Sequence, residues 1–197
     1  MRTRSEKPES KNLNEVLKTL EIPPDGWDIL IFGDGAGSNW LRECGWASVS
    51  IERETMERRV WYGGANVGTS NFAELMAHLQ PLTWLLGREA DRLKDPKARR
   101  RALRVHVITD SSYCEDLGSS TARTKPKNVL LWRILEDCRR HGLIVAWHWL
   151  PRNTLDLTES VDKLSKAALK IFKEQAPEFI RRRWGDPADV YDANPEG

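Results

Sequence analysis

Residues 27–35 read WDILIFGDG, an apolar run that stops at the triplet Gly33-Asp34-Gly35. A short apolar run that ends in turn-forming glycines is typical of a buried strand. In open α/β sheets, functional groups gather outside the carboxyl ends of parallel strands. We therefore predict a central strand over 27–32, with Asp34 just beyond its carboxyl end.

The pattern downstream predicts a mixed sheet flanked by helices. Residues 45–51 and 59–62 alternate around a charged connection, which indicates an antiparallel hairpin. From residue 71 the apolar spacing becomes helical, with Ser70 or Asn71 as the N-cap. Strands are expected at 103–109 and 143–150, further helices at 128–140 and 158–175, and either a helix extension or a loop over 88–101. Hairpin strands followed by strand–helix units favour a mixed α/β sheet.

The two ends of the chain differ from its middle. Residues 1–25 are polar and charged apart from one short amphipathic stretch, and a Pro-Pro-Asp-Gly turn follows at 23–26. We predict an N-terminal arm or short helix over 1–25, one domain over 26–175 and a C-terminal tail over 176–197.

Composition and charge exclude several classes of protein. The 197 residues are 40% hydrophobic and include 9 Trp, which argues against a disordered chain. No apolar run approaches the roughly 18–20 residues of a membrane span, and no signal-peptide core is visible. The 3 Cys are too few for a disulfide framework, and 31 Lys and Arg against 29 Asp and Glu leave a formal net charge of +2. We expect a soluble, cytoplasmic protein that binds no membrane.

Four carboxylates occupy related positions in these elements. Asp34 and Asp110 each follow an apolar strand, while Glu74 and Asp162 lie near the start of a helix, beside its apolar stripe. Each has an ordinary alternative: a turn for Asp34, a helix cap for Asp110, and the helix dipole for the other two. Together they favour one site, because clustered carboxylates repel one another unless cations bind between them. No His or Cys joins them at zinc-ligand spacing, which indicates an ion that prefers oxygen ligands.

The segments around these carboxylates resemble type 1 ribonuclease H. IFGDG (31–35), TSNFAELMA (69–77), VITDSSY (107–113) and ESVDKLSKAA (159–168) match the four active-site blocks of that family in order. WHWL (147–150) matches its last strand. The resemblance covers about residues 28–170, and four blocks in the right order form a specific signal.

The resemblance implies a ribonuclease H-like α/β fold: a five-stranded mixed sheet with strands 1–3 antiparallel and strands 1, 4 and 5 parallel. It also implies that a monomer hydrolyses the RNA strand of an RNA–DNA hybrid with two Mg²⁺ or Mn²⁺ ions, leaving 5′-phosphate products. The implied catalytic and metal-binding residues are Asp34, Glu74, Asp110 and Asp162. Asp34 would bridge the ions, Glu74 and Asp110 would hold one ion, and Asp162 would hold the other.

Substrate contacts are expected on both sides of the carboxylates. Asn39, Ser70 and Asn71 match positions at which the family reads the minor groove, although Asn71 suits a helix cap equally well. The basic, Trp-bearing protrusion of some members is absent from the sequence, so other basic residues are expected to hold the DNA strand. The expected substrate-binding residues are Asn39, Ser70, Asn71, Arg123, Lys125, Lys127 and Arg152.

The loop after the last strand, PRNTLDLT (151–158), lacks the His that family members commonly carry there. Asp156 or Glu159 either replaces it or is an ordinary exposed acid. This departure concerns the rate of product release more than cleavage. Four Trp fall at periodic positions and are expected to pack in the core: Trp46, Trp132, Trp147 and Trp149.

Two other functions fit parts of the pattern. Transposases, integrases and junction resolvases place carboxylates on a similar sheet and cut DNA, but the order Asp, Glu, Asp, Asp and the block at 70–76 favour ribonuclease H. A hybrid-binding module without catalysis is the second alternative. Retention of four mutually repelling carboxylates argues against it.

Overall fold

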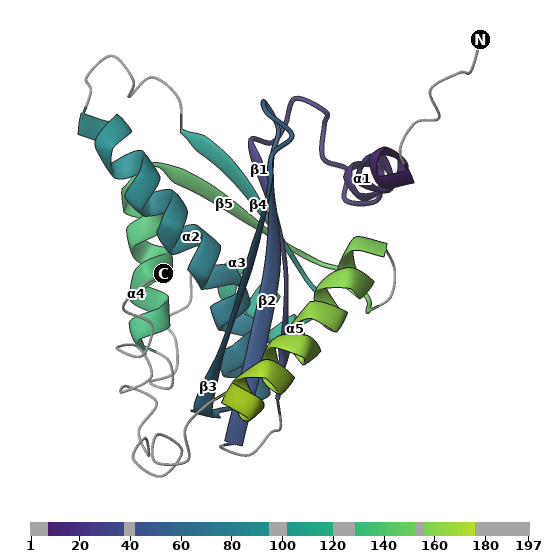
Figure 1. Ribbon diagram of the computed structural model, residues 1–197. Helices are drawn as coiled ribbons and strands as arrows, with labels where there is room; N and C mark the ends of the chain where they lie inside the picture. Colours follow the sequence, from purple (N-terminus) through teal and green to yellow (C-terminus); the bar gives the residue numbers. More distant parts are fainter. Residues whose placement is uncertain (1–7, 38–41, 95–101, 120–128, 153–155, 176–197) are drawn as a thin grey trace.

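The computed structural model describes residues 8–37, 42–94, 102–119, 129–152 and 156–175. A five-stranded sheet in the order β3-β2-β1-β4-β5 forms its centre (Figure 1). The strands are β1 (Ile29–Ala36), β2 (Arg42–Glu52), β3 (Arg58–Gly68), β4 (Leu103–Thr109) and β5 (Leu143–Trp149). β2 runs antiparallel to β1 and β3, while β4 runs parallel to β1 and β5. This confirms the predicted mixed sheet.

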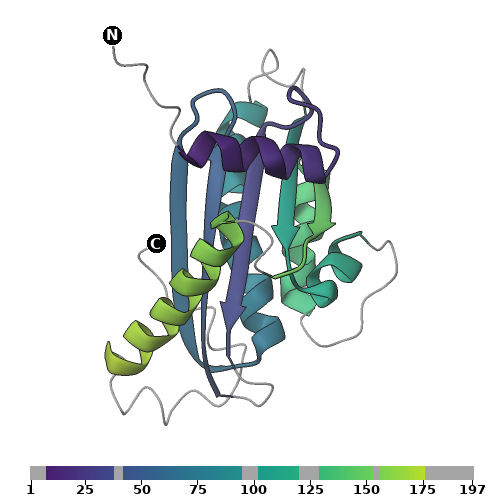
Figure 2. The ribbon, with the colours of Figure 1, turned by 90° about the vertical axis from the view of Figure 1, so that its right-hand side faces the viewer.

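Helices cover both faces of the sheet (Figures 1 and 2). One face carries α2, α3 and α4, and the other carries α1 and α5. Their bounds are α1 (Pro8–Thr19), α2 (Ser70–Lys94), α3 (Ser112–Ser119), α4 (Val129–Arg140) and α5 (Asp156–Gln175). No helix among the described residues has the length and apolar character that crossing a bilayer requires.

Two cores lie on the two faces of the sheet, and β1 contributes to both. Ile29 and Ile31 point into the core beneath α2 and α4, whereas Leu30 and Phe32 point into the core beneath α1. Successive side chains of a strand alternate between faces, so a strand covered on both sides must be apolar throughout. This explains the uninterrupted apolar run of residues 29–32.

The N-terminal segment packs on the sheet as α1. Leu13, Val16 and Leu17 are buried in the second core, and in Figure 2 the helix lies across the upper part of the sheet. The amphipathic stretch of the sequence is therefore a covering helix. The division into an arm, a domain over 26–175 and a tail stays a prediction, and residues 176–197 lie outside the described residues.

The end of β1 differs from the sequence-based expectation, and the structure of residues 88–94 settles an alternative that the sequence left open. β1 does not stop at Gly33, because its pairing with β2 continues through Asp34↔Ala47 to Ala36↔Gly45. Asp34 thus lies inside the strand rather than in a turn. Of the two alternatives for residues 88–101, the helix extension is the structure found as far as Lys94, where the described part of α2 ends.

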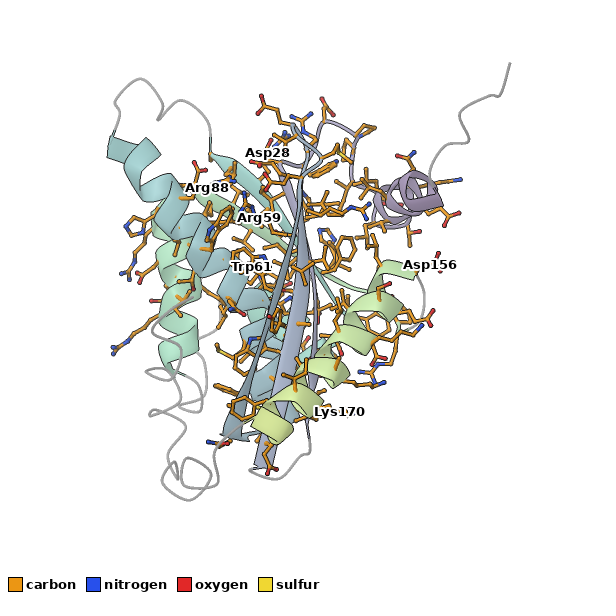
Figure 3. All side chains as sticks on the ribbon, in the orientation of Figure 1. Asp28, Arg59, Trp61, Arg88, Asp156 and Lys170 are labelled. Carbon is orange, nitrogen blue, oxygen red and sulfur yellow. The ribbon has the colours of Figure 1, made fainter. Side chains whose placement is uncertain are left out.

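An aromatic cluster joins the β2–β3 hairpin to α2. The ring centroids of Trp61 and Trp84 lie 5.3 Å apart. The guanidinium carbons of Arg59 and Arg88 lie 4.6 Å and 5.0 Å from the centroid of the Trp84 ring. Arg88 also pairs with Glu52 at 3.1 Å. Figure 3 shows Arg59, Trp61 and Arg88 together on the α2 side of the sheet. Such cation–π contacts fix the angle of the long helix against the hairpin.

Candidate active site

Two glycines of β1 allow α2 to lie directly against the strand. A Cβ at Gly35 would overlap the backbone nitrogen of Glu74, and one at Gly33 would overlap the ring of His78. Only glycine permits so close an approach of two backbones. The N-terminal part of α2, which carries Glu74, is therefore held beside Asp34.

Neither Asn71 nor Asp110 caps a helix. The hydroxyl of Thr69 accepts a hydrogen bond from the backbone N–H of Phe72 at 3.1 Å, so Thr69 caps α2. The hydroxyl of Ser111 accepts one from the N–H of Cys114 at 3.3 Å and caps α3. The prediction that Ser70 or Asn71 caps α2 is therefore wrong, as is the capping alternative for Asp110.

Three carboxylates from three elements meet at one place. One carboxylate oxygen from each of Asp34, Glu74 and Asp110 lies within 4.8 Å of the others. Asp34 comes from β1 and Asp110 directly follows β4, whose parallel pairing with β1 reaches Phe32↔Ile108. In parallel strands this register places the residues two positions further on side by side. The predicted adjacency of Asp34 and Asp110 is confirmed.

Asp162 approaches from α5, on the other side of Asp34. Its Oδ2 accepts a hydrogen bond from Lys166 Nζ at 2.7 Å, while its Oδ1 is buried and has no hydrogen-bond partner among the described residues. After burial and the negative charge of Asp110, the negative charge of Asp162 is a smaller cause that raises the pKa of Asp34. Asp162 is not part of the 4.8 Å group. The predicted site of four carboxylates therefore consists of three close carboxylates and a fourth nearby.

Ser165 links Asp34 to α5 and was missed by the sequence analysis. Its fully buried hydroxyl donates to Asp34 Oδ2 at 2.6 Å and lies 2.9 Å from the backbone oxygen of Asp162. The spacing i, i+3 from Asp162 places both residues on one helix face, which is the signal that would have found it.

The site is desolvated and carries excess negative charge. Burial is the main cause that raises the pKa of Glu74 to about 7. A hydrogen bond from Ser111 lowers this pKa, and the negative charges of Asp110 and Asp34 raise it further. Burial is also the main cause that raises the pKa of Asp34. Both shifts have the sign expected for carboxylates that need a positive partner.

The donor set fits a divalent cation. The close ligands are carboxylates, and Glu74 Oε2 is buried without a hydrogen-bond partner among the described residues. Mg²⁺ and related hard ions take oxygen ligands of this kind, whereas zinc sites are usually built with His or Cys. Asp34, Glu74 and Asp110 are thus able to hold such an ion.

Arg152 is the cationic side chain in contact with the cluster among the described residues. Its Nε donates to Asp110 Oδ2 at 2.7 Å, and its Nη2 lies 3.4 Å from Asp34 Oδ1. The hydrogen bond to Asp110 is the main cause that raises the pKa of Arg152 above its ordinary value. The predicted substrate-binding arginine is therefore at the site, in contact with the candidate metal ligands.

Trp149 does not pack in the core as predicted. It is 48% exposed, and its Nε1 donates to the backbone oxygen of Asp110 at 3.0 Å. Position 149 continues the alternating pattern of the strand, but Trp149 is the last residue of β5, which is an edge strand. Trp46 and Trp147 are buried as expected, and the side chain of Trp132 lies outside the described residues.

The remaining residues singled out in the sequence lie partly within the described part of the chain and partly outside it. Ser70 and Asn71 stand in the first turn of α2, one turn before Glu74, and Asn71 is exposed. Of the two loop acids, Asp156 begins α5 (Figure 3) and Glu159 pairs with Lys163 on its exposed face. The others lie outside the described residues: Asn39, Arg123, Lys125 and Lys127.

The glycine at position 35 supports a sharp prediction. Gly35→Ala is expected to lower the cleavage rate about a hundredfold, because the added methyl group displaces the turn that carries Glu74 and misplacement by about 1 Å has effects of this size. The measurement is the initial rate of the metal-dependent nucleic-acid cleavage that the sequence predicts, with circular dichroism to confirm folding. Gly87→Ala is the matched control, since a Cβ there meets nothing within 4 Å. A Gly35→Ala protein that is folded and fully active would contradict the prediction.

Comparison with known proteins agrees with the fold. No family model matches the chain. The ribonuclease H of Nitrosomonas eutropha is 32% identical over 145 residues, covering 66% of this chain and 82% of that protein. The N-terminal ribonuclease H domain of a Mycobacterium tuberculosis protein superposes with a TM-score of 0.58 at 16% identity, covering 76% of this chain and 98% of that one.

A second solved structure is LC11-RNase H1 in complex with an RNA/DNA hybrid, with a TM-score of 0.57 at 18% identity and coverage of 73% and 97%. At these identities the two solved structures establish the fold alone. The sequence match extends over most of a ribonuclease H. Given 32% identity across 82% of that enzyme, the chain belongs to the ribonuclease H family.

Proposed function

We propose that this protein is an endonuclease that hydrolyses the RNA strand of RNA–DNA hybrids with two divalent metal ions, leaving 5′-phosphate products. The family and the acidic cluster point to a metal-dependent ribonuclease H. The observation that carries the proposal is the meeting of Asp34, Glu74 and Asp110 within 4.8 Å. The hybrid bound by LC11-RNase H1 supports the choice of substrate.

The proposed roles follow from where the carboxylates lie. Bound divalent ions would lower the pKa of water and stabilise charge on the leaving 3′ oxygen. Asp34, on the central strand beside Asp110 and in contact with α5 through Ser165, would be a ligand of both ions. Glu74 and Asp110 would complete one ion site, and Asp162 the other.

Desolvation makes these ligands effective. Asp34 is 5% exposed, so few water molecules compete with an ion or a phosphate for its carboxylate. Ser165 holds Asp34 Oδ2 at 2.6 Å and orients the carboxylate from behind. A ligand whose rotamer is fixed in this way loses less entropy when an ion binds.

Ser70 and Asn71 are proposed to contact the hybrid beside Glu74. Because Thr69 caps α2, the exposed amide of Asn71 is available to donate to and accept from nucleic-acid groups. The 2′-hydroxyl is the group that distinguishes RNA from DNA in a minor groove. Asn39 and the basic residues Arg123, Lys125 and Lys127 remain proposed contacts on sequence grounds.

Cleavage of labelled duplexes tests the proposal directly. The same sequence is offered as RNA–DNA hybrid, duplex DNA and duplex RNA, with Mg²⁺, with Mn²⁺ and with EDTA. The expected result is cutting of the RNA strand of the hybrid alone, only when metal is present, with 5′ phosphates on the products. A ligation assay that requires 5′ phosphate identifies the product ends.

The alternative functions predict different outcomes. Cutting of duplex DNA alone would favour a transposase-like or resolvase-like nuclease. Hybrid binding without cleavage under every metal condition would favour a non-catalytic binding module. Either result would overturn the proposed activity while leaving the family assignment in place.

A further inference from the structure

Arg152 contacts two of the three carboxylates that are proposed to hold a metal ion. It follows Pro151 in the segment after β5. Its guanidinium contacts Asp34 of β1 and Asp110, the residue after β4. The contacts are Nε to Asp110 Oδ2 at 2.7 Å and Nη2 to Asp34 Oδ1 at 3.4 Å. A guanidinium and a divalent cation therefore compete for the same two carboxylates.

Both oxygens of Asp34 are engaged within the protein. Arg152 contacts Oδ1, and Ser165 donates to Oδ2 at 2.6 Å. A cation that binds Asp34 repels the positive guanidinium of Arg152, whereas the neutral hydroxyl of Ser165 can stay beside it. Ser165 is fully buried on α5, whereas the side chain of Arg152 is 53% exposed at the surface of the site. Arg152 is the partner that has room to leave.

The cluster has little other positive charge to replace Arg152. Lys166 pairs with Asp162 at 2.7 Å, and its side chain is 64% exposed on α5. Among the described residues, no other arginine or lysine is recorded in contact with Asp34, Glu74 or Asp110. Without a bound cation, Arg152 is therefore the main group that offsets repulsion between Asp34 and Asp110.

We propose that Arg152 is the internal counter-ion of this site, that a divalent cation displaces it from Asp34 and Asp110, and that the displaced guanidinium then binds a phosphate of the nucleic-acid substrate. The inference rests on the proposed metal-dependent function. A planar guanidinium binds carboxylates and phosphates through the same paired N–H donors, so the exchange of partners conserves its hydrogen bonds. Metal binding and substrate binding are coupled through this one side chain, and such coupling is reciprocal.

The first test measures metal affinity without turnover. Mn²⁺ is titrated by calorimetry into metal-free protein, with wild type compared with Arg152→Gln. The variant is expected to bind Mn²⁺ about tenfold more tightly, within the usual range of coupling between two sites, because no guanidinium has to be displaced. Arg140→Gln is the matched control: it makes the same change on the exposed face of α4, where Arg140 pairs with Glu136. Its Mn²⁺ affinity is expected to equal that of wild type.

The second test measures the substrate arm of the coupling. At saturating Mg²⁺, the KM of Arg152→Gln for the hybrid is expected to rise about tenfold, because the variant lacks the charged hydrogen bond that the guanidinium would make to a phosphate. Arg152→Lys keeps the charge but not the paired donors, and both of its constants are expected to fall between those of wild type and Arg152→Gln. A residue that only stabilises the loop would not shift the two constants in opposite directions.

The outcomes separate this inference from the proposed function. If wild type binds Mn²⁺ and Arg152→Gln binds it no more tightly, the counter-ion role is wrong and the metal-dependent function stands. If the variant binds Mn²⁺ more tightly but its KM is unchanged, the phosphate contact is wrong. If wild type itself binds no Mn²⁺, both the inference and the metal-dependent function fail.

Discussion

Asp110→Asn is expected to abolish metal-dependent cleavage of an RNA–DNA hybrid while leaving the protein folded. Asparagine has the shape of aspartate but lacks the charge that a divalent cation requires. Metal-based charge stabilisation contributes several kcal/mol to such reactions. Since each 1.36 kcal/mol changes a rate tenfold, the expected loss is about a thousandfold or more.

The structure provides a control for this variant in the same region. Asp116 lies on α3, is exposed and is not one of the clustered carboxylates, so Asp116→Asn makes the same chemical change away from the site. The measurements are initial cleavage rates at several Mg²⁺ concentrations and circular dichroism spectra of both variants. Asp110→Asn activity within tenfold of wild type would falsify the assignment of Asp110 as a metal ligand.

Glu74→Gln is expected to stabilise the metal-free protein at alkaline pH. Burial raises the pKa of Glu74 to about 7 from an ordinary value of 4.5. Because the folded-state pKa is the higher one, the contribution of Glu74 to stability is fully present below pH 4.5 and is lost as the pH rises through about 7. A shift of this size corresponds to a loss on the order of 3 kcal/mol in the free energy of unfolding. Glutamine does not titrate and avoids this loss.

The difference in unfolding free energy between variant and wild type is therefore expected to increase from pH 4.5 to pH 8. Urea unfolding in EDTA at several pH values measures it directly. Added Mg²⁺ should stabilise wild type more than the variant at pH 8, because only wild type retains the full set of carboxylate ligands. Glu136→Gln is the control, since Glu136 is an exposed residue of α4 that pairs with Arg140. A difference that is the same at every pH would contradict the raised pKa of the buried Glu74 carboxyl.

The order of strands and helices and the four candidate carboxylates were predictable from local pattern. An apolar run covered on both faces, an alternating hairpin and a helical stripe each leave a signal in the residues that form them. The same holds for the placement of Asp34 and Asp110, because parallel pairing of β1 with β4 brings their carboxyl ends together. These features depend on neighbours in sequence or on one strand pairing.

Contacts between distant segments were decided only by the tertiary structure. Ser165 contacts Asp34 across 131 positions of sequence, and Arg152 contacts it across 118, so no local pattern records either pair. The exposure of Trp149 at a sheet edge and the packing of α1 were likewise settled by what lies opposite each residue. The chemical types at the site can be read along the chain, but their partners, and therefore their charge balance, depend on packing between elements that folding alone brings together.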